Sequence, residues 1–399
     1  MCHLTTGRGN SRDRLESIFH AIKQESNAAC SQRWRGHFDR SKGPSHQIVL
    51  FGSGALGLWV LQRLRHAGVE PCCFADNDPA RWGTSIDRLE VLSPSDAVAR
   101  FGRDVSYVVT IYNGSAARKQ LRGLGCFHVL PVLALFWKHP NEFMPNHGID
   151  SPERLVEDEP QIRECFESLS DEVSRHGLCD QVQWRYWLEP DFLDVARDAG
   201  EMYFPDDLVL PNSEEIFVDC GAFDGDTIRS FLRRQKSFRR LYALEPDGAN
   251  RSALLAYLAQ QNASVREQVT VWPFAVTDVD GSATFLSTHN VASKLSSSGN
   301  GNTQECRALD SMEWTLAPTY IKMDIEGSEP EALAGGKRLI QRAMPVLAVC
   351  LYHRSEHLWQ IPNLIHSIEP RYSLFLRRYA EDCWETVCYA VPQHRLVRN

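Results

Sequence analysis

Two acidic, glycine-containing clusters, well separated in the sequence, could carry chemistry. In the first, the apolar pair Phe217-Val218 leads into Asp219-x-Gly221-x-x-x-Gly225. In the second, the strand-like run at 320–323 (YIKM) leads into 324–327 (DIEG). Ligands of open α/β sheets bind outside the carboxyl ends of the strands, so two such ends indicate one shared pocket.

The first cluster is acidic where a phosphate site would be neutral. Asp219, Asp224 and Asp226 would repel a phosphate, and the turn lacks the Gly-x-Gly-x-x-Gly spacing of pyrophosphate sites. Glu245 ends the next predicted strand, roughly 20 residues after the turn, where an acid can bind ribose hydroxyls. This pattern favours the sulfonium and amino groups of S-adenosylmethionine. The alternative is a glycine turn within an unrelated α/β sheet.

Three side chains near the later strand ends are candidates for catalysis. Asp324 and Glu326 could bind the amino acid part of the donor, act as a base, hold a divalent ion, or only cap the next helix. His353 follows the next predicted strand and is our candidate general base, because imidazole titrates near neutral pH. A structural histidine is the alternative. His353 and His357 also fit His-x-x-Glu-His, but the first histidine ends a strand, so we predict no zinc site and no metal ligands.

Several segments resemble one known family, the FkbM-type S-adenosylmethionine-dependent methyltransferases. The matching segments are 218–227 (VDCGAFDGDT), 243–246 (ALEP), 274–278 (FAVTD), 321–327 (IKMDIEG), 351–353, 357–359 and 384–387. They occur in order over residues 203–392, nearly half of the chain. The resemblance implies a class I methyltransferase fold and usually O-methylation, often of sugars or polyketides.

The resemblance also implies the positions of the donor site. It assigns donor-binding roles to Asp219, Gly221, Glu245 and Asp324. We place the rest of that site on the matched segments, at Ala222, Phe223, Asp224, Gly225, Thr227, Pro246 and Ala275. The implied cofactor is S-adenosyl-L-methionine, and the implied partner is a small-molecule or glycan acceptor.

A second glycine motif lies near the N-terminus. Gly52-x-Gly54-x-x-Gly57 follows an apolar strand and opens a helix, and Asp76 ends the next strand. The region resembles the small Rossmann-like domains attached to some sugar-modifying enzymes. It favours a nucleotide or nucleotide-sugar site, with a degenerate scaffold or NAD chemistry as alternatives. The rival functions of the chain are therefore an NAD(P)-linked oxidoreductase, a nucleotide-sugar-binding protein, or a non-catalytic binding module.

The predicted elements form an α/β chain with two Rossmann-like domains. We expect a polar arm with a helix at 11–23 in residues 1–45, a Rossmann-like βαβ domain at 46–140, a helical connecting segment at 141–211, and a class I methyltransferase domain at 212–399. We also expect single helices at 155–169, 192–199 and 330–342, one strand at 269–275, and a closing hairpin of strands at 372–378 and 385–390. The Ser/Gly-rich loop at 289–302 is either a substrate lid or a simple insertion.

Composition limits the partners. The chain of 399 residues has 43 basic and 51 acidic residues and a net charge of −8, which argues against a broad nucleic-acid footprint. The 12 cysteines include no Cys-x-x-Cys, and we expect reduced thiols. Residues 1–11 have no apolar signal core, and no apolar run approaches the ~20 residues of a membrane helix, so we expect a cytoplasmic protein. Homo-oligomerisation stays open.

Overall fold

The chain divides into two compact units. The computed structural model describes residues 10–189, 192–193, 197–235, 237–286, 294–296 and 302–397. The first unit comprises Met1–Glu157, Asp180–Val195 and Ala380–Trp384, and the second comprises Asp158–Cys179, Ala196–Tyr379 and Glu385–Asn399. The connecting segment predicted at 141–211 is therefore divided between the two units.

The first unit begins with two capped helices, α1 (Ser11–Gln24) and α2 (Asn27–Ser41). The side chain of Asn10 accepts a hydrogen bond from the backbone N–H of Arg12, and that of Ser26 accepts one from Ala29. Such caps satisfy N–H groups that have no partner within the helix. The helix predicted at residues 11–23 is confirmed.

A six-stranded sheet forms the core of the first unit. Its strands lie in the order β3 (Ser85–Ile86), β4 (Leu89–Leu92), β2 (Cys73–Ala75), β1 (Ile48–Phe51), β5 (Ser106–Val109) and β6 (His128–Pro131). Every neighbouring pair is parallel except β3 with β4. The unit also contains α3 (Ala55–His66), α4 (Pro94–Phe101), α5 (Ser115–Gly123), α6 (Leu133–Lys138), α7 (Pro140–Phe143) and α8 (Glu153–Glu157). The strand that follows β1 in the sequence, β2, lies on one side of it, and β5 lies on the other side. The strand order therefore reverses between β1 and β5, which makes a topological switch point there.

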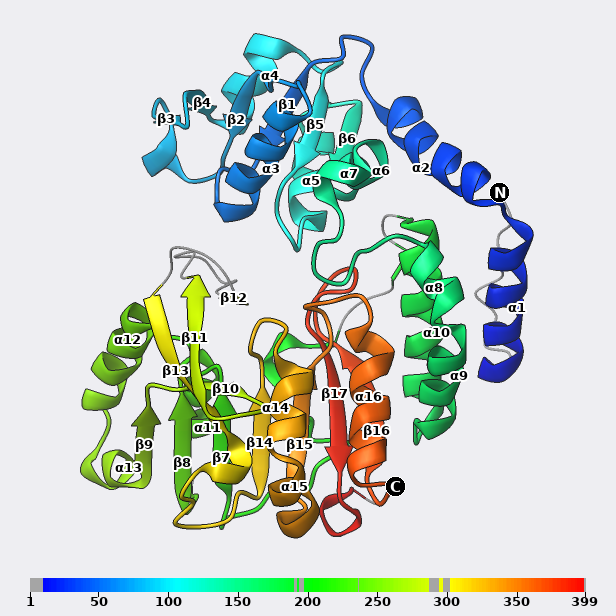
Figure 1. The fold of residues 1–399 in the computed structure, drawn as a ribbon. Coiled ribbons are helices and arrows are strands. Elements are labelled where there is room, and N and C mark those ends of the chain that lie inside the picture. The colour runs from blue at the N-terminus through cyan, green and yellow to red at the C-terminus, as the bar shows by residue number, and fades with distance from the viewer. Residues whose placement is uncertain are drawn as a thin grey trace. The chain divides into compact units, whose positions relative to one another are not determined.

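A seven-stranded sheet forms the core of the second unit (Figure 1). Its strands lie in the order β16 (Ser373–Arg378), β17 (Thr386–Val391), β15 (Val346–Cys350), β14 (Tyr320–Met323), β7 (Ile216–Cys220), β8 (Arg240–Leu244) and β9 (Val269–Trp272). All are parallel except β17, which runs antiparallel to both of its neighbours. The predicted closing hairpin is confirmed. A switch point lies between β7 and β14.

Helices cover the faces of this sheet, as they must when the central strands are buried along their whole length. Figure 1 shows α14, α15 and α16 along one face. The helices of the second unit are α9 (Glu159–Ser168), α11 (Asp226–Arg234), α12 (Gly248–Ala259), α13 (Ala263–Gln268), α14 (Glu329–Gly335), α15 (Lys337–Ala343) and α16 (His357–Ile368). Helix α10 (Glu172–Trp187) contributes residues to both units.

The single strand predicted at 269–275 is wrong. After β9 the chain passes through Pro273 and starts β10 (Ala275–Thr277), which belongs to a separate four-stranded sheet. Proline lacks a backbone N–H and cannot continue a strand ladder, which explains the break. The other strands of that sheet are β13 (Asn302–Ala308), β11 (Gly281–Leu286) and β12 (Lys294–Ser296). The predicted lid at 289–302 lies mostly outside the described residues.

Two predicted helices are each split in two. The helix predicted at 155–169 is α8 followed by α9, because Pro160 fits only the first turn of a helix and starts a new one. The helix predicted at 330–342 is α14 followed by α15, with the break at Gly335-Gly336. A Cβ on Gly335 would lie 2.2 Å from the Thr277 carbonyl oxygen. Within the described part of 192–199 there is no α-helix, and only a 3-10 turn begins at Ala199.

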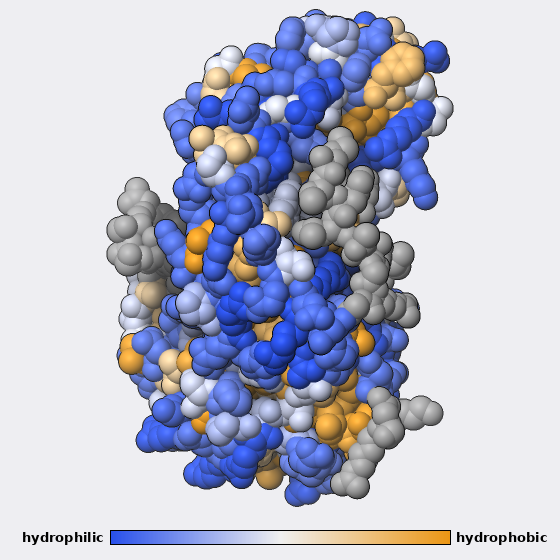
Figure 2. Space-filling model, turned by 90° about the vertical axis from the view of Figure 1, so that its right-hand side faces the viewer, coloured by the Kyte–Doolittle hydropathy of each residue, from blue (hydrophilic) through white to orange (hydrophobic). Residues whose placement is uncertain are grey.

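The surface is that of an ordinary globular chain. Figure 2 shows a face that is mostly hydrophilic, with scattered hydrophobic patches. The large exposed apolar side chains, such as Trp82 and Val279, are spread along the sequence, apart from the adjacent pair Ile111 and Tyr112. No disulfide joins the eleven described cysteines, and ten of them are buried. Among the described residues, no helix is both long and apolar enough to cross a membrane.

Candidate active site

The glycine turn after β7 brings two strand ends into contact. Gly221 has φ +81°, and a Cβ there would lie 1.9 Å from the Asp324 carbonyl oxygen. The N–H groups of Gly221 and Ala222 both donate to the Leu244 carbonyl, at the end of β8. Only glycine permits this approach. The turn is therefore pressed against the ends of β8 and β14, at the switch point.

Glu245 stabilises the turn after β7 through backbone hydrogen bonds. It is buried, and its carboxylate accepts hydrogen bonds from the backbone N–H groups of Phe223 and Asp247, each at 2.8 Å. Burial raises the pKa of this carboxyl group above its ordinary value. Each carboxylate oxygen carries two lone pairs, so each retains one for a ligand hydroxyl.

A buried ion pair supports the same turn. Lys322 Nζ lies 2.9 Å from Asp219 Oδ1 and donates to the Gly221 carbonyl at 2.8 Å, and both side chains are almost fully buried. Burial alone would lower the lysine pKa, but the Asp219 carboxylate raises it, so the ammonium stays charged. Asp219 thus serves the turn through Lys322, a residue that we did not predict for the site. A lysine inside an otherwise apolar strand was the available signal.

Asp324 lies at the exposed side of this arrangement. Its carboxylate accepts hydrogen bonds from Tyr203 Oη at 2.8 Å and Tyr352 Oη at 3.3 Å, and His353 Nε2 lies 3.2 Å away. Burial would raise its pKa, but the His353 hydrogen bond and the Lys322 charge hold it well below the ordinary value. Asp324 is therefore ionised and fixed in orientation. Tyr203 comes from the predicted connecting segment and was not expected here.

His353 belongs to a buried charged chain of side chains. Its Nδ1 lies 2.8 Å from Glu329 Oε1, and its Nε2 faces Asp324 and, at 3.7 Å, Glu326. Glu329 also accepts from the N–H of Ile325 and pairs with His357 at 3.4 Å. Burial would lower the His353 pKa, but the Glu329 charge and the two carboxylate hydrogen bonds raise it well above the ordinary value.

This arrangement decides what His353 can do. An imidazolium that already carries its proton cannot accept another, so the base role predicted for His353 requires the proton to be lost first. Glu329, which we did not predict, orients the ring. Asp324, Glu329 and His353 have ligand-type atoms within 4.8 Å of one another, but each is engaged in these contacts, and we assign no metal ligand among them.

The remaining predicted donor-site residues do not all lie at the turn after β7. Phe223 lies in the turn with φ +47°, and Thr227 is buried in the first turn of α11. Asp224 instead turns toward Arg229, at 2.6 Å. Gly225 is the N-cap residue of α11, with φ +90°, and Pro246 follows Glu245 after the end of β8. Ala275 begins β10 of the four-stranded sheet and is therefore not at a strand end of the main sheet.

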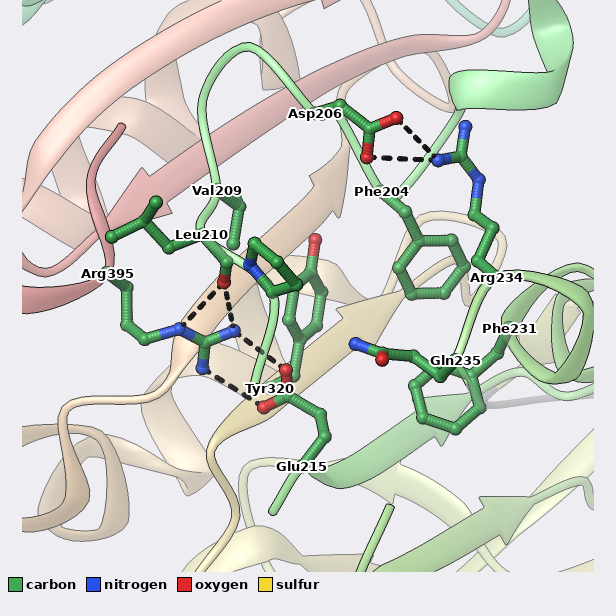
Figure 3. Close-up of a pocket in the computed structure, with 11 residues that line it drawn as sticks. Phe204, Asp206, Val209, Leu210, Glu215, Phe231, Arg234, Gln235, Tyr320 and Arg395 are labelled. Atoms are coloured by element: carbon green, nitrogen blue, oxygen red, sulfur yellow. Dashed lines mark hydrogen bonds and ion pairs between the residues drawn. The ribbon is translucent and has the colours of Figure 1, made fainter. Parts of the chain in front are cut away.

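A separate cavity of about 230 Å³ lies at the N-terminal ends of β7 and β14, away from their carboxyl ends (Figure 3). Phe204, Phe231 and Tyr320 form its aromatic wall. Arg395 pairs with Glu215 at 2.7 Å in its lining and donates to the Leu210 carbonyl. These contacts join the segment around Arg395 to the start of β7. Because the cavity lies where the strands begin, it is distinct from the acidic turn, which lies where they end.

The N-terminal glycine motif forms a similar turn in the first unit. Gly52 has φ +112°, and a Cβ on Gly57 would lie 2.0 Å from the Gly52 carbonyl oxygen. Asp76 accepts from the Ser53 N–H at 2.8 Å and from the Ser53 hydroxyl at 2.5 Å. The four residues predicted for a nucleotide site are thus brought together. Whether they bind a nucleotide stays a prediction.

The fold and the site together define a class of protein. A parallel sheet with one antiparallel strand next to its edge, a glycine turn after its first central strand, and an acid after the next strand are the features of a class I methyltransferase. The comparisons agree on this fold. The crystal structure of methyltransferase FkbM from Methylobacillus flagellatus KT is 24% identical, with a TM-score of 0.72 over 96% of this chain and 100% of that one.

Residues 219–381 match the family model of the methyltransferase FkbM domain. Residues 219–381 are therefore similar to the FkbM methyltransferase domain, as the sequence resemblance predicted. A putative rRNA-methylase from Clostridium thermocellum aligns with 8% identity over 52% of this chain and 99% of that one, with a TM-score of 0.33. A comparison with curated proteins finds no match.

Proposed function

We propose that the protein transfers a methyl group from S-adenosylmethionine to a hydroxyl group of a sugar or a small secondary metabolite. The observation that supports this most is the group of acidic residues at the carboxyl ends of β7, β8 and β14, which we call the acidic edge. There Gly221 touches the Asp324 backbone, and Glu245 binds the turn between them.

The residues at this edge fit such a donor. Its sulfonium and amino groups are positive, and the edge carries the carboxylates of Asp226 and Asp324, with Lys322 kept away by its pairing with Asp219. When bound, the donor supplies a methyl group on a positively charged sulfur. The edge contains no cluster of unpaired cations, among the described residues, that would prefer a phosphate.

Each side chain then has a defined task. Glu245 accepts hydrogen bonds from ribose hydroxyls with its remaining lone pairs. Asp324, oriented by Tyr203 and Tyr352, attracts the positive end of the donor. His353 and Glu329 keep Asp324 ionised and in place. Alignment of this kind can account for much of the rate of a methyl transfer.

Two measurements test the proposal. Calorimetry with S-adenosylhomocysteine should show one site per chain. Transfer of a tritiated methyl group from S-adenosylmethionine should then label one hydroxyl-bearing class in a panel of free sugars, nucleotide sugars, phenolic compounds and amines. The absence of both binding and labelling at millimolar ligand would contradict the proposal. Labelling of amines alone would contradict the assignment to a hydroxyl.

The alternative, an NAD(P)-linked oxidoreductase built on the first unit, is not favoured by the family match in the second unit. A non-catalytic module would bind S-adenosylhomocysteine without labelling any acceptor. The same two measurements therefore separate all three functions.

A further inference from the structure

One more titratable side chain reaches the acidic edge, from the C-terminal hairpin. Glu385 immediately precedes β17, which runs antiparallel to β15 with Val387 opposite Cys350. The N–H of Leu351 donates to the Thr386 carbonyl at 2.8 Å. Because β17 is antiparallel, its first residues lie at the edge where the parallel strands end and ligands bind.

The backbone of Glu385 is held in an uncommon conformation. Its φ is +50°, and its carbonyl accepts a hydrogen bond from the Tyr379 N–H at 3.0 Å. Three other non-glycine residues at the same edge also have positive φ, namely Tyr203, Phe223 and Glu326. Left-handed conformations are strained for non-glycine residues and concentrate at functional sites. Phe223, Glu326 and Glu385 lie next to strand ends there, and Tyr203 reaches Asp324 with its side chain.

The surroundings of Glu385 set its proton affinity. Tyr352 acts on its carboxylate, and the Tyr352 hydroxyl lies 3.3 Å from Asp324 Oδ1. Burial and the negative charge of Asp324 raise the pKa of Glu385 to about 7, against the opposing charge of His353. The titratable groups that act on its charge are Asp226, Asp324, His353 and Tyr352, and its own charge acts on Tyr203 and Cys350.

The carboxylates at this edge thus differ in basicity. Asp324 is held ionised by its partners and binds a proton only far below neutral pH, whereas His353 is already protonated. Glu385 is only partly exposed and is poised to exchange a proton near pH 7. A general base works best when its pKa is near the working pH.

We propose that Glu385 is the proton acceptor for the hydroxyl group that is methylated. This role rests on the proposed methyltransferase function. The acceptor oxygen forms a bond to the methyl carbon while the carbon–sulfur bond breaks, and its electron pair stays on the sulfur. The hydroxyl proton moves to the Glu385 carboxylate, which becomes a neutral acid. The positive charge lost at sulfur and the negative charge lost at Glu385 balance.

The first experiment needs no acceptor. Infrared pH titration of the full chain with bound S-adenosylhomocysteine follows the carbonyl stretch of protonated carboxyl groups. The wild-type protein should show a component that titrates near pH 7, and Glu385→Gln should lack it. Glu331→Gln, which removes an exposed carboxylate on α14, is the matched control and should keep it. A wild-type titration identical to that of Glu385→Gln would overturn the proposal.

The second experiment measures transfer to the acceptor labelled in the panel. Glu385→Gln should bind S-adenosylhomocysteine within about twofold of wild type yet transfer about 10²–10⁴-fold more slowly. The wild-type rate should rise with pH through about 7, and this rise should vanish in Glu385→Gln. Glu385→Asp should recover part of the rate.

The outcomes distinguish the two proposals. A wild-type protein that neither binds S-adenosylhomocysteine nor labels any acceptor overturns the proposed function and, with it, this role. A wild-type protein that transfers methyl groups, with Glu385→Gln equally fast and equally pH-dependent, overturns only the role of Glu385.

Discussion

The two units contain the same strand–turn–helix arrangement, but the residues around the turn carry different charges. In each, a glycine turn follows the first central strand at a switch point, after β1 in one unit and after β7 in the other. The Gly52 N–H donates to the Ala75 carbonyl at 2.8 Å, and the Gly221 N–H donates to the Leu244 carbonyl at 3.0 Å. The backbone plan is therefore shared.

The acid after the second strand also does the same local work in both. Asp76 accepts from the Ser53 N–H, and Glu245 accepts from the Phe223 N–H, each at 2.8 Å. Burial raises the pKa of Glu245. Burial would also raise the pKa of Asp76, but the hydrogen bonds from Ser53 and Asp78 and the charge of Arg81 together lower it. The acid fixes the turn before it binds any ligand.

Charge is what separates the two turns. The turn Gly52–Gly57 contains no acid, and Gly54, the N-cap residue of α3, offers no side-chain cap. The turn after β7 is flanked by Asp219 and Asp224, and Asp226 stands in the first turn of α11. A helix N-terminus attracts anions unless acids are already there. The glycine spacing alone therefore does not specify the ligand, and the surrounding side chains do.

The largest expected effect comes from Gly221→Ala. The added Cβ would meet the Asp324 carbonyl oxygen at 1.9 Å, and φ +81° disfavours any side chain. We expect the second unit to lose more than about 5 kcal/mol of stability. Hydrogen exchange of peptides from β7 and β14 in increasing urea measures this without mixing the two units.

The matched change in the first turn is Gly54→Ala. Nothing lies within 4 Å of a Cβ there, and φ is −75°, so stability should change by only about 0.5 kcal/mol. Equal damage from both substitutions would show that the close approach at Gly221 is not what holds the second turn.

The next effect is Glu329→Gln, which breaks the buried charged chain. Removing one partner of a buried pair costs about 3–5 kcal/mol. The pKa of Glu329 is held below 4.5, so its contribution is present above that pH and is lost as pH falls through the folded value. The pKa of His353 is raised, so its contribution is full below 6.5 and is lost as pH rises through the folded value.

Chemical denaturation between pH 3 and 8 tests this. The wild-type second unit should lose stability below about pH 4.5, and Glu329→Gln should show a much flatter acid limb. Asp96→Asn, which changes a capping interaction in the first unit, is the control and should leave the acid limb of the second unit unchanged. An unchanged acid limb in Glu329→Gln would contradict the role of Glu329 in the buried charged chain.

The sequence predicted the parts of this comparison that are local. The fold class, both glycine turns and the acids Asp76 and Glu245 follow from strand periodicity and short spacings. Tyr203 and Glu385 were not predicted as site residues, because they reach the edge through long-range topology that no local spacing records. Glu329 was missed because a glutamate in the first turn of a helix is usually only a dipole partner.

A third prediction compares the two strand-end acids. Glu245→Gln removes the charge that we expect to bind ribose hydroxyls, and it should weaken S-adenosylhomocysteine binding by about tenfold to a hundredfold, since a hydrogen bond to a charged group contributes about 1.5–3 kcal/mol. Asp76→Asn makes the same change in the first unit and should leave that affinity unaltered. Calorimetry on the full chain measures both. Equal losses would show that the donor does not depend on the second turn alone.

The smallest effect comes from making the first turn acidic like the second. Gly54 faces open space at the start of α3, so Gly54→Asp and Gly54→Ser should both fold, and each adds a cap to the helix. They differ mainly in charge. If the first turn binds a phosphate group, as its sequence predicts, Gly54→Asp should bind NADH or UDP-glucose about fivefold more weakly than Gly54→Ser.

Calorimetry with each nucleotide probe, with and without S-adenosylhomocysteine, checks this difference. S-adenosylhomocysteine affinity should be the same in both variants, because the charge is added only to the first turn. If wild type and Gly54→Ser bind neither probe, the first turn shares the backbone arrangement of the second but is not a phosphate site. If Gly54→Asp binds a probe as tightly as Gly54→Ser, charge does not govern the first turn, and the distinction drawn between the two turns is wrong.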